Sequence, residues 1–117
     1  MMEKKIKVSE LTGSPSALTV EQGDLLYSEI KKILDQNNEA VIDFMDVESI
    51  ITPFLNASIG RLYETYTSEI LKEKVKIINQ PEGTNRKFNM VIRNAKQFYA
   101  DKAGYTNIVE EIMEKDD

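Results

Sequence analysis

The stretch "AVIDF", residues 40–44, limits the possible fold more than any other part of the chain. Four of its five residues are apolar, and they do not alternate with polar ones. An apolar run of this length is typical of a strand covered on both faces, as parallel strands in α/β domains are. We therefore expect a central, buried strand at residues 40–44.

The sequence before this strand predicts one further strand and one helix. Residues 4–11 alternate between polar and apolar side chains, which indicates a half-exposed strand. The "TGSPS" turn follows, and a short extra strand is expected near residues 17–20. Thr19 and Gln22 have capping-box spacing, so a helix should run from there to about residue 36. Its buried stripe is predicted to be Leu26, Ile30, Ile33 and Leu34.

After the central strand, the pattern alternates again between helix and strand. Thr52 is the expected N-cap of a helix with Pro53 at its first position, where a missing N–H costs nothing. Residues 74–79 should form the next strand, and a strand–helix–strand unit of this length closes as a parallel crossover. A helix capped by Thr84 or Asn85 follows, with Gly104 as its expected end and a short final helix behind it. Apolar residues at helical spacing predict the buried faces. For the helix after Thr52 they are Leu55, Ile59, Leu62 and Tyr66. For the helix after Thr84 or Asn85 they are Phe88, Val91, Ile92, Ala95 and Phe98.

This order of elements predicts an α/β fold in one domain over residues 1–117. The sheet should be small, mixed but mainly parallel, with three to five strands and helices packed on it. A chain of 117 residues has room for one such core.

Composition limits what such a domain can do. The chain has no Cys and no His, so thiolate catalysis, cysteine zinc sites and the usual triads are excluded. We therefore expect a protein that is not an enzyme and needs no cofactor. The net charge of −5 argues against nucleic acid as a partner, since phosphate backbones attract clustered Lys and Arg. No apolar span or secretory signal is evident, so we expect no membrane association and a cytoplasmic location.

Asp43 and Asp46 follow the central strand and suggest one kind of chemistry. Carboxylates at the end of a strand can hold Mg²⁺ or accept a phosphoryl group, as in receiver domains, but the acid pair that such a site needs after the first strand is missing. The alternative is that Asp43 hydrogen-bonds backbone amides of its own loop while Asp46 is solvated.

Thr52 also has two interpretations. As an N-cap it would stabilise its helix by about 1 kcal/mol. As a phosphoacceptor it would place about two negative charges at the positive end of that helix. Thr52 could serve as the N-cap only while it is unmodified, so the two roles are compatible only in that state.

The segments "VIDFMDVESI" and "TPFLNASIGRLYETY" resemble the STAS domain, the fold of bacterial anti-sigma-factor antagonists, and its STAS-like relatives of uncharacterised function. The segment "KVKIINQPEGTNRKFNMVI" is similar to the next strand and helix of that fold. In the antagonists the corner reads Asp-Ser-Ser-Gly, and a kinase phosphorylates its second Ser. Here Pro53 takes the place of that Ser. The STAS-like relatives have a Ser or Thr pair followed by Phe, which Thr52 and Phe54 fit better.

The resemblance implies a regulatory module that binds a partner protein through the corner at residues 50–61. The expected partner is an ATPase of the histidine-kinase type or an anti-sigma-type kinase. Five residues are the expected contacts: Thr52, Pro53, Phe54, Asn56 and Arg61. Phe54 would either hold the helix in the core or form an apolar contact. The remaining alternative is a purely structural subunit, and we expect a monomer or a weak homo-oligomer.

Overall fold

The computed structural model describes residues 2–116 of the chain, and side chains for residues 2–100. Its main sheet contains β1 (Glu3–Lys7), β3 (Glu39–Asp43) and β5 (Val75–Ile78). The strand order is β1-β3-β5, and both pairs are parallel. The predicted run at residues 40–44 is therefore the central strand. β2 (Ser16–Ala17) and β4 (Ser49–Ile50) form a separate two-stranded parallel sheet. This α/β arrangement confirms the predicted fold class.

Six α-helices and one π-helix are found in the part of the chain that the structure describes. In chain order they are α1 (Val8–Thr12), α2 (Val20–Asp35), α3 (Thr52–Leu55), the π-helix η1 (Asn56–Gly60), α4 (Leu62–Thr65), α5 (Ser68–Lys74) and α6 (Asn85–Asp116). Helix α2 begins with the predicted capping box, because Thr19 accepts from the Gln22 N–H and Gln22 accepts from the Thr19 N–H.

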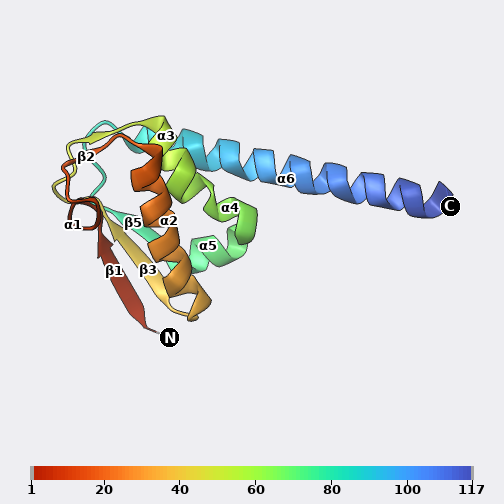
Figure 1. Ribbon diagram of the computed structural model, residues 1–117, viewed down its shortest axis with the longest axis horizontal. Helices are drawn as coiled ribbons and strands as arrows, with labels where there is room; N and C mark the ends of the chain where they lie inside the picture. The colour runs from red at the N-terminus through yellow and green to blue at the C-terminus, as the bar shows by residue number, and fades with distance from the viewer. Residues whose placement is uncertain (1, 117) are drawn as a thin grey trace.

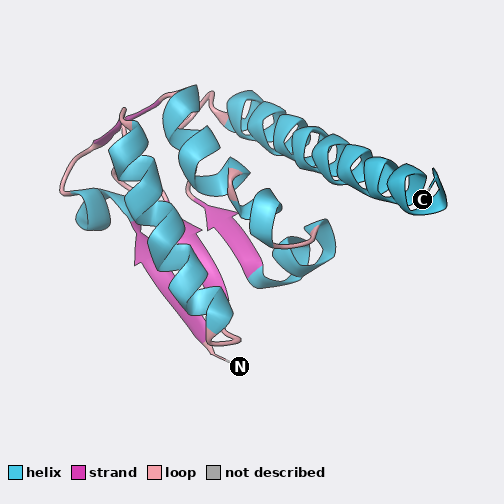
Figure 2. Ribbon diagram, turned by 45° about the vertical axis from the view of Figure 1, so that its right-hand side comes forward, coloured by secondary structure: helices cyan, strands magenta, loops and turns pink. Residues whose placement is uncertain are grey.

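Helices α2 to α5 lie on one side of the main sheet (Figures 1 and 2). Ile6, Ile42 and Ile77 share one register row and belong to the core on that side. On the opposite side, Val41 lies between Lys5 and Lys76 in the adjacent row. The central strand is buried on both faces, as expected, although α2 to α5 cover only one of them. Val41 is nevertheless only 7% exposed, because long lysine side chains can cover an apolar neighbour with their alkyl stems.

The core sits between this sheet face and the helices. Its largest fully buried side chains include Phe44, Phe54, Leu26, Ile30, Ile42, Leu55 and Leu62. Phe44 at the end of β3 meets Phe88 of α6 edge to face, with ring centroids 5.1 Å apart. The start of α6 is thereby fixed on the core.

The first strand is shorter than predicted. It ends at Lys7, and the alternating residues beyond it form α1 instead. Thr12 donates its hydroxyl proton to the Val8 carbonyl, and Gly13 ends the helix at a φ of 70°, a left-handed conformation that glycine adopts without strain. Alternation over so few residues is compatible with one helical turn, and Val8 is buried in either conformation.

The helix after Thr52 is not continuous. It divides into α3, η1 and α4, and α5 follows as a helix that the sequence did not predict. The predicted Thr52 cap is also wrong. The Leu55 N–H donates to the Ile51 carbonyl, so the helix begins one residue earlier and Ile51 is its N-cap.

Helix α6 also differs from the prediction. Its backbone is helical through Gly104, so the predicted stop and the separate final helix are wrong. An interior glycine costs a helix only about 1 kcal/mol, which does not end it when its neighbours favour helix. Phe98 was expected in the buried stripe, but it is 60% exposed. Helix α6 extends past the core toward its C-terminal end (Figure 1).

Candidate functional site

The corner at residues 50–61 contains β4, α3, η1 and Arg61. It follows the C-terminal end of β3 and lies beside the start of α2 (Figure 1). The Ile51 N–H donates to the Ala17 carbonyl, so the corner continues the short β2–β4 sheet. The backbone is therefore held in place before α3 begins.

Phe54 fixes the corner to the core. It is fully buried, as are Leu55 and Ser58. The Ser58 hydroxyl donates to the Phe54 carbonyl at 2.8 Å, which satisfies the one buried polar side chain of the corner. Of the two roles considered for Phe54, the structure supports the core role, and a direct partner contact by Phe54 is contradicted.

Gly23 of α2 allows the corner to pack closely. A Cβ atom at Gly23 would lie 2.6 Å from the Phe54 carbonyl oxygen and 2.8 Å from the Ala57 Cβ. Both distances are shorter than real contacts, so no larger residue fits without moving one of the two helices. The two backbones therefore touch at this point.

Lys87 of α6 holds the other side of the corner. Its Nζ donates to the Ile50 carbonyl oxygen at 2.7 Å in a partly buried environment. Sequence reasoning did not identify this residue. The only local signal was a lysine near the start of a helix, which is usually solvated.

The other predicted contact residues have different environments. Pro53 and Asn56 are exposed, and Thr52 is partly exposed. Arg61 is also at the surface, but its guanidinium lies 4.4 Å from the centroid of the Tyr27 ring and 3.8 Å from Asp24 Oδ1. Arg61 is therefore oriented by α2 rather than extended freely into solvent.

Three exposed apolar residues lie near these polar ones. Leu18 is 44% exposed, Val20 49% and Ile51 36%. Leu18 and Ile51 follow directly on the paired residues Ala17 and Ile50, and Val20 precedes Gly23 by one turn on α2. Sequence reasoning did not assign Leu18 and Val20 to this surface. The one available signal was that Leu18 precedes the N-cap of α2 and that Val20 falls outside the predicted buried stripe of that helix. We call Leu18, Val20, Ile51, Pro53 and Asn56 the corner surface.

Asp43, which ends β3, has a structural environment. It is buried, and its Oδ1 accepts from the Met45 N–H and from Asn79 Nδ2, each at 2.9 Å. Its Oδ2 lies 3.1 Å from Lys5 Nζ. Burial alone would raise the pKa of Asp43, but the hydrogen bonds from Asn79 and Met45 and the charge of Lys5 outweigh it and hold the pKa below its ordinary value. Asp43 thus connects the ends of all three strands.

Asp46 is separate from this arrangement. It is exposed, adopts a positive φ of 69° and pairs with Lys7 at 3.0 Å. Among the residues whose side chains are described, no group of three or more acids is placed to hold a metal ion. The two carboxylates have different lysine partners, so the arrangement gives no support to a shared magnesium site.

Comparison with known proteins identifies the family of the chain. A family model described as a STAS-like domain of unknown function (DUF4325) matches residues 22–82, which is more than half of the chain. The chain belongs to this family. No curated protein and no solved structure matches the chain.

The STAS-like match covers most of α2 and every element from β3 to β5. It therefore contains the corner, Gly23 and Asp43. β1, α1, β2 and α6 lie outside it, so Lys87 and Leu18 reach the corner from segments that the family model does not include. Over the residues described, no helix of this STAS-like domain is both long and apolar enough to cross a membrane.

Proposed function

We propose that this STAS-like domain is a non-enzymatic regulatory module that docks on a partner protein through its corner surface. One observation carries the proposal: exposed apolar side chains gather on a backbone that the core holds rigid. Ile51 and Pro53 are exposed while Phe54, the next residue, is fully buried. A surface of this kind loses little conformational entropy when a partner binds.

The proposed partner is an ATPase of the histidine-kinase type or an anti-sigma-type kinase. The resemblance of the STAS-like fold to the anti-sigma-factor antagonists supports this choice of partner. Apolar contacts would come from Leu18, Val20 and Ile51, with polar contacts from Asn56 and Arg61. Arg61 would keep its place over Tyr27, since a partner carboxylate could approach the guanidinium without displacing it.

Thr52 remains our proposed phosphoacceptor. Its side chain is partly exposed and gives the helix no N-cap bond, so modification would not remove a cap. A phosphate there would add negative charge between Ile51 and Pro53 of the corner surface and would weaken docking of an acidic partner. Mass spectrometry of the protein purified from its native host tests this directly, and an unmodified Thr52 throughout growth would count against it.

Site-specific photo-crosslinking in the native host tests the docking surface. A photoreactive amino acid at Asn56 should give an adduct with one protein, whose identity is then read by mass spectrometry. The matched control is the same amino acid at Gln36, an exposed residue at the C-terminal end of α2, the end of that helix opposite to Val20. Val20→Asp should reduce the Asn56 adduct about tenfold or more, because it puts a charge into the apolar contact.

Folding of each variant is checked by its amide NMR spectrum. Equal adducts from the two positions, or an Asn56 adduct that Val20→Asp leaves unchanged, would contradict docking at this surface. An adduct with a second copy of the chain would instead indicate a homo-oligomer.

A further inference from the structure

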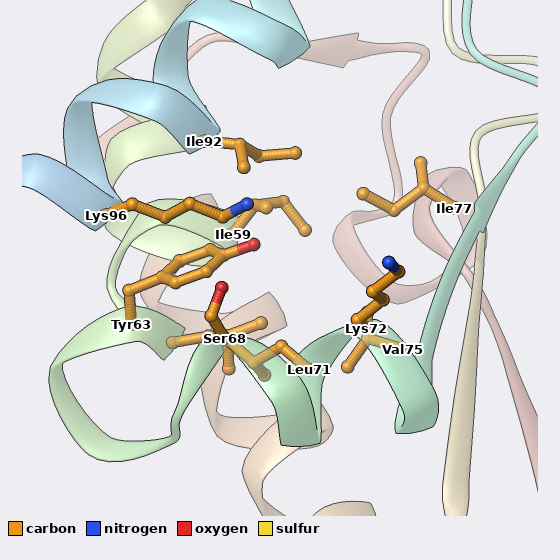
Figure 3. Close-up of a pocket in the computed structure, with 10 residues that line it drawn as sticks. Ile59, Tyr63, Ser68, Leu71, Lys72, Val75, Ile77, Ile92 and Lys96 are labelled. Atoms are coloured by element: carbon orange, nitrogen blue, oxygen red, sulfur yellow. The ribbon is translucent and has the colours of Figure 1, made fainter.

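A cavity lies on the side of the helical layer away from the corner surface. It has a volume of about 340 Å³, at the lower end of the range of small-molecule sites. Its walls come from η1, α4, α5, β5 and α6 (Figure 3). None of the residues assigned to docking lines it.

The topology explains why this space is unfilled. β5 is an edge strand of the main sheet, and α5 packs on it. Helix α6 packs instead on α3, η1 and α4, and then leads away from the body of the protein (Figure 1). A gap therefore remains between α6 and the helix-covered face of β5.

Most of the cavity wall is apolar. The apolar lining residues are Ile59, Leu62, Leu71, Val75, Ile77 and Ile92. Val75, Ile77 and Ile92 are only partly buried, although they face the helical side of the fold. Such surface is unfavourable in water, and a bound apolar group would remove it from solvent at a gain of about 25 cal/mol per Å².

Polar groups project into the same space. Figure 3 shows Lys96, Tyr63 and Ser68 directed into the cavity from α6, α4 and α5, and Lys72 of α5 on the side of the cavity nearer to Ile77 of β5. Among the described side chains, neither Lys72 nor Lys96 forms an ion pair, while most other lysines near acids do. Neither charge is therefore paired with an acidic side chain within the described part of the chain.

The hydroxyl groups add donors to these charges. Partial burial raises the pKa of Tyr63, so its hydroxyl stays protonated and able to donate at neutral pH. Ser68 supplies a second hydroxyl from the first turn of α5. Two cations and two donors beside an apolar wall match a ligand with one anionic end and one apolar end.

We propose that this cavity binds a medium-chain fatty carboxylate. The chain would lie against the apolar wall formed by Leu71, Ile77 and Ile92. The carboxylate would accept hydrogen bonds from Lys72, Lys96 and the Tyr63 hydroxyl. No covalent step is involved.

Titration of the full chain with decanoate, followed by amide NMR, tests the proposal. Saturable shifts are expected at Leu71, Ile77 and Ile92 and not at the corner surface. The matched probes are decanol, which lacks the charge, acetate, which lacks the chain, and decyltrimethylammonium, which reverses the charge. Decanoate should bind more tightly than all three.

Substitutions at two exposed lysines locate the carboxylate of the bound decanoate. Lys72→Gln and Lys96→Gln should each weaken decanoate binding about tenfold, since each removes a charged hydrogen bond. Lys4→Gln, at an exposed lysine of β1 outside the cavity, is the matched control and should leave binding unchanged.

Three results would overturn the proposal. The first is the absence of saturable shifts at the cavity residues. The second is equal decanoate affinity in the Lys72→Gln, Lys96→Gln double variant and in Lys4→Gln. The third is tighter binding of decyltrimethylammonium than of decanoate, which would indicate a site for cations.

Discussion

The segment formed by α3, η1 and α4 packs on its two neighbours in different ways. On the α2 side the backbones touch at Gly23, and hydrogen bonds link Tyr27 to Thr65 at 3.0 Å and Tyr66 to Asp35 at 2.7 Å. On the side of α5, β5 and α6 the same segment borders a cavity of about 340 Å³. One helical segment thus has a fully packed side and an unfilled side.

This difference shows which contacts set the geometry of the fold. A packed contact between backbones tolerates no added atom, whereas side chains that line an open cavity have room beside them and can accept one. We therefore expect added volume to destabilise the α2 side and to be harmless at the cavity. Substitutions on both sides of the segment test this contrast.

Gly23→Ala should have the largest effect. The new Cβ would meet the Phe54 carbonyl oxygen and Ala57, so α2 must shift and the free energy of unfolding should fall by about 3 kcal/mol. Gly60→Ala is the matched control. Its Cβ would be 3.4 Å from Val91 Cγ1, the nearest atom, so its cost should stay within about 1 kcal/mol. Urea denaturation followed by circular dichroism measures both, and equal costs would remove the contrast.

Asp43→Asn should have the next largest effect, because Asp43 fixes the strand ends that position the packed side. The variant loses the charged contact with Lys5 and has two weaker hydrogen bonds, so its free energy of unfolding should fall by about 2 kcal/mol at neutral pH. The pKa of Asp43 is lowered in the folded protein from its ordinary value of 3.8. The stabilisation is therefore present above that value and is lost as the pH falls through the lower, folded-state pKa.

Urea denaturation at pH 7 and at pH 3 measures this dependence. The difference between wild type and Asp43→Asn should narrow at the lower pH. Asp46→Asn, which removes an exposed pair with Lys7, is the control and should cost less than about 1 kcal/mol. A cost at Asp46 as large as that at Asp43 would show that burial does not distinguish the two acids.

Val75→Ile should have the smallest effect on the free energy of unfolding, and it should raise that free energy rather than lower it. Val75 lines the cavity, so the added methylene enters unfilled space and should raise the free energy of unfolding by up to about 0.8 kcal/mol. Thermal unfolding in the absence of fatty acid measures it. A loss of stability would mean that the cavity does not accept added volume.

Elements that depend on neighbours in the sequence could be predicted from it. The Thr19–Gln22 capping box and the apolar run of β3 use interactions within a few residues, and both are confirmed. The Thr52 cap failed although its pattern was also local. A helix can begin at either of two adjacent residues with similar energy, and here Ile51 took the cap position while continuing the β2–β4 pairing.

The candidate site could be predicted only in part. Pro53, Asn56 and Arg61 lie at the surface as expected, but Phe54 is in the core. Helical spacing places Phe54 and Leu55 side by side without showing how far around the helix the core extends. The close approach of α2 decides how far the core extends, because it buries the face of α3 that carries Phe54 as well as the face that carries Leu55.

The amino-acid sequence by itself determined the α/β class, the central strand and the start of α2, because periodicity and capping act over a few residues. Only the tertiary structure decided that Gly23 is a contact between helices, that Lys87 holds the corner, and that Lys72 and Lys96 share a cavity. These residues are far apart in the chain, and their interactions depend on how the helices stack against the sheet.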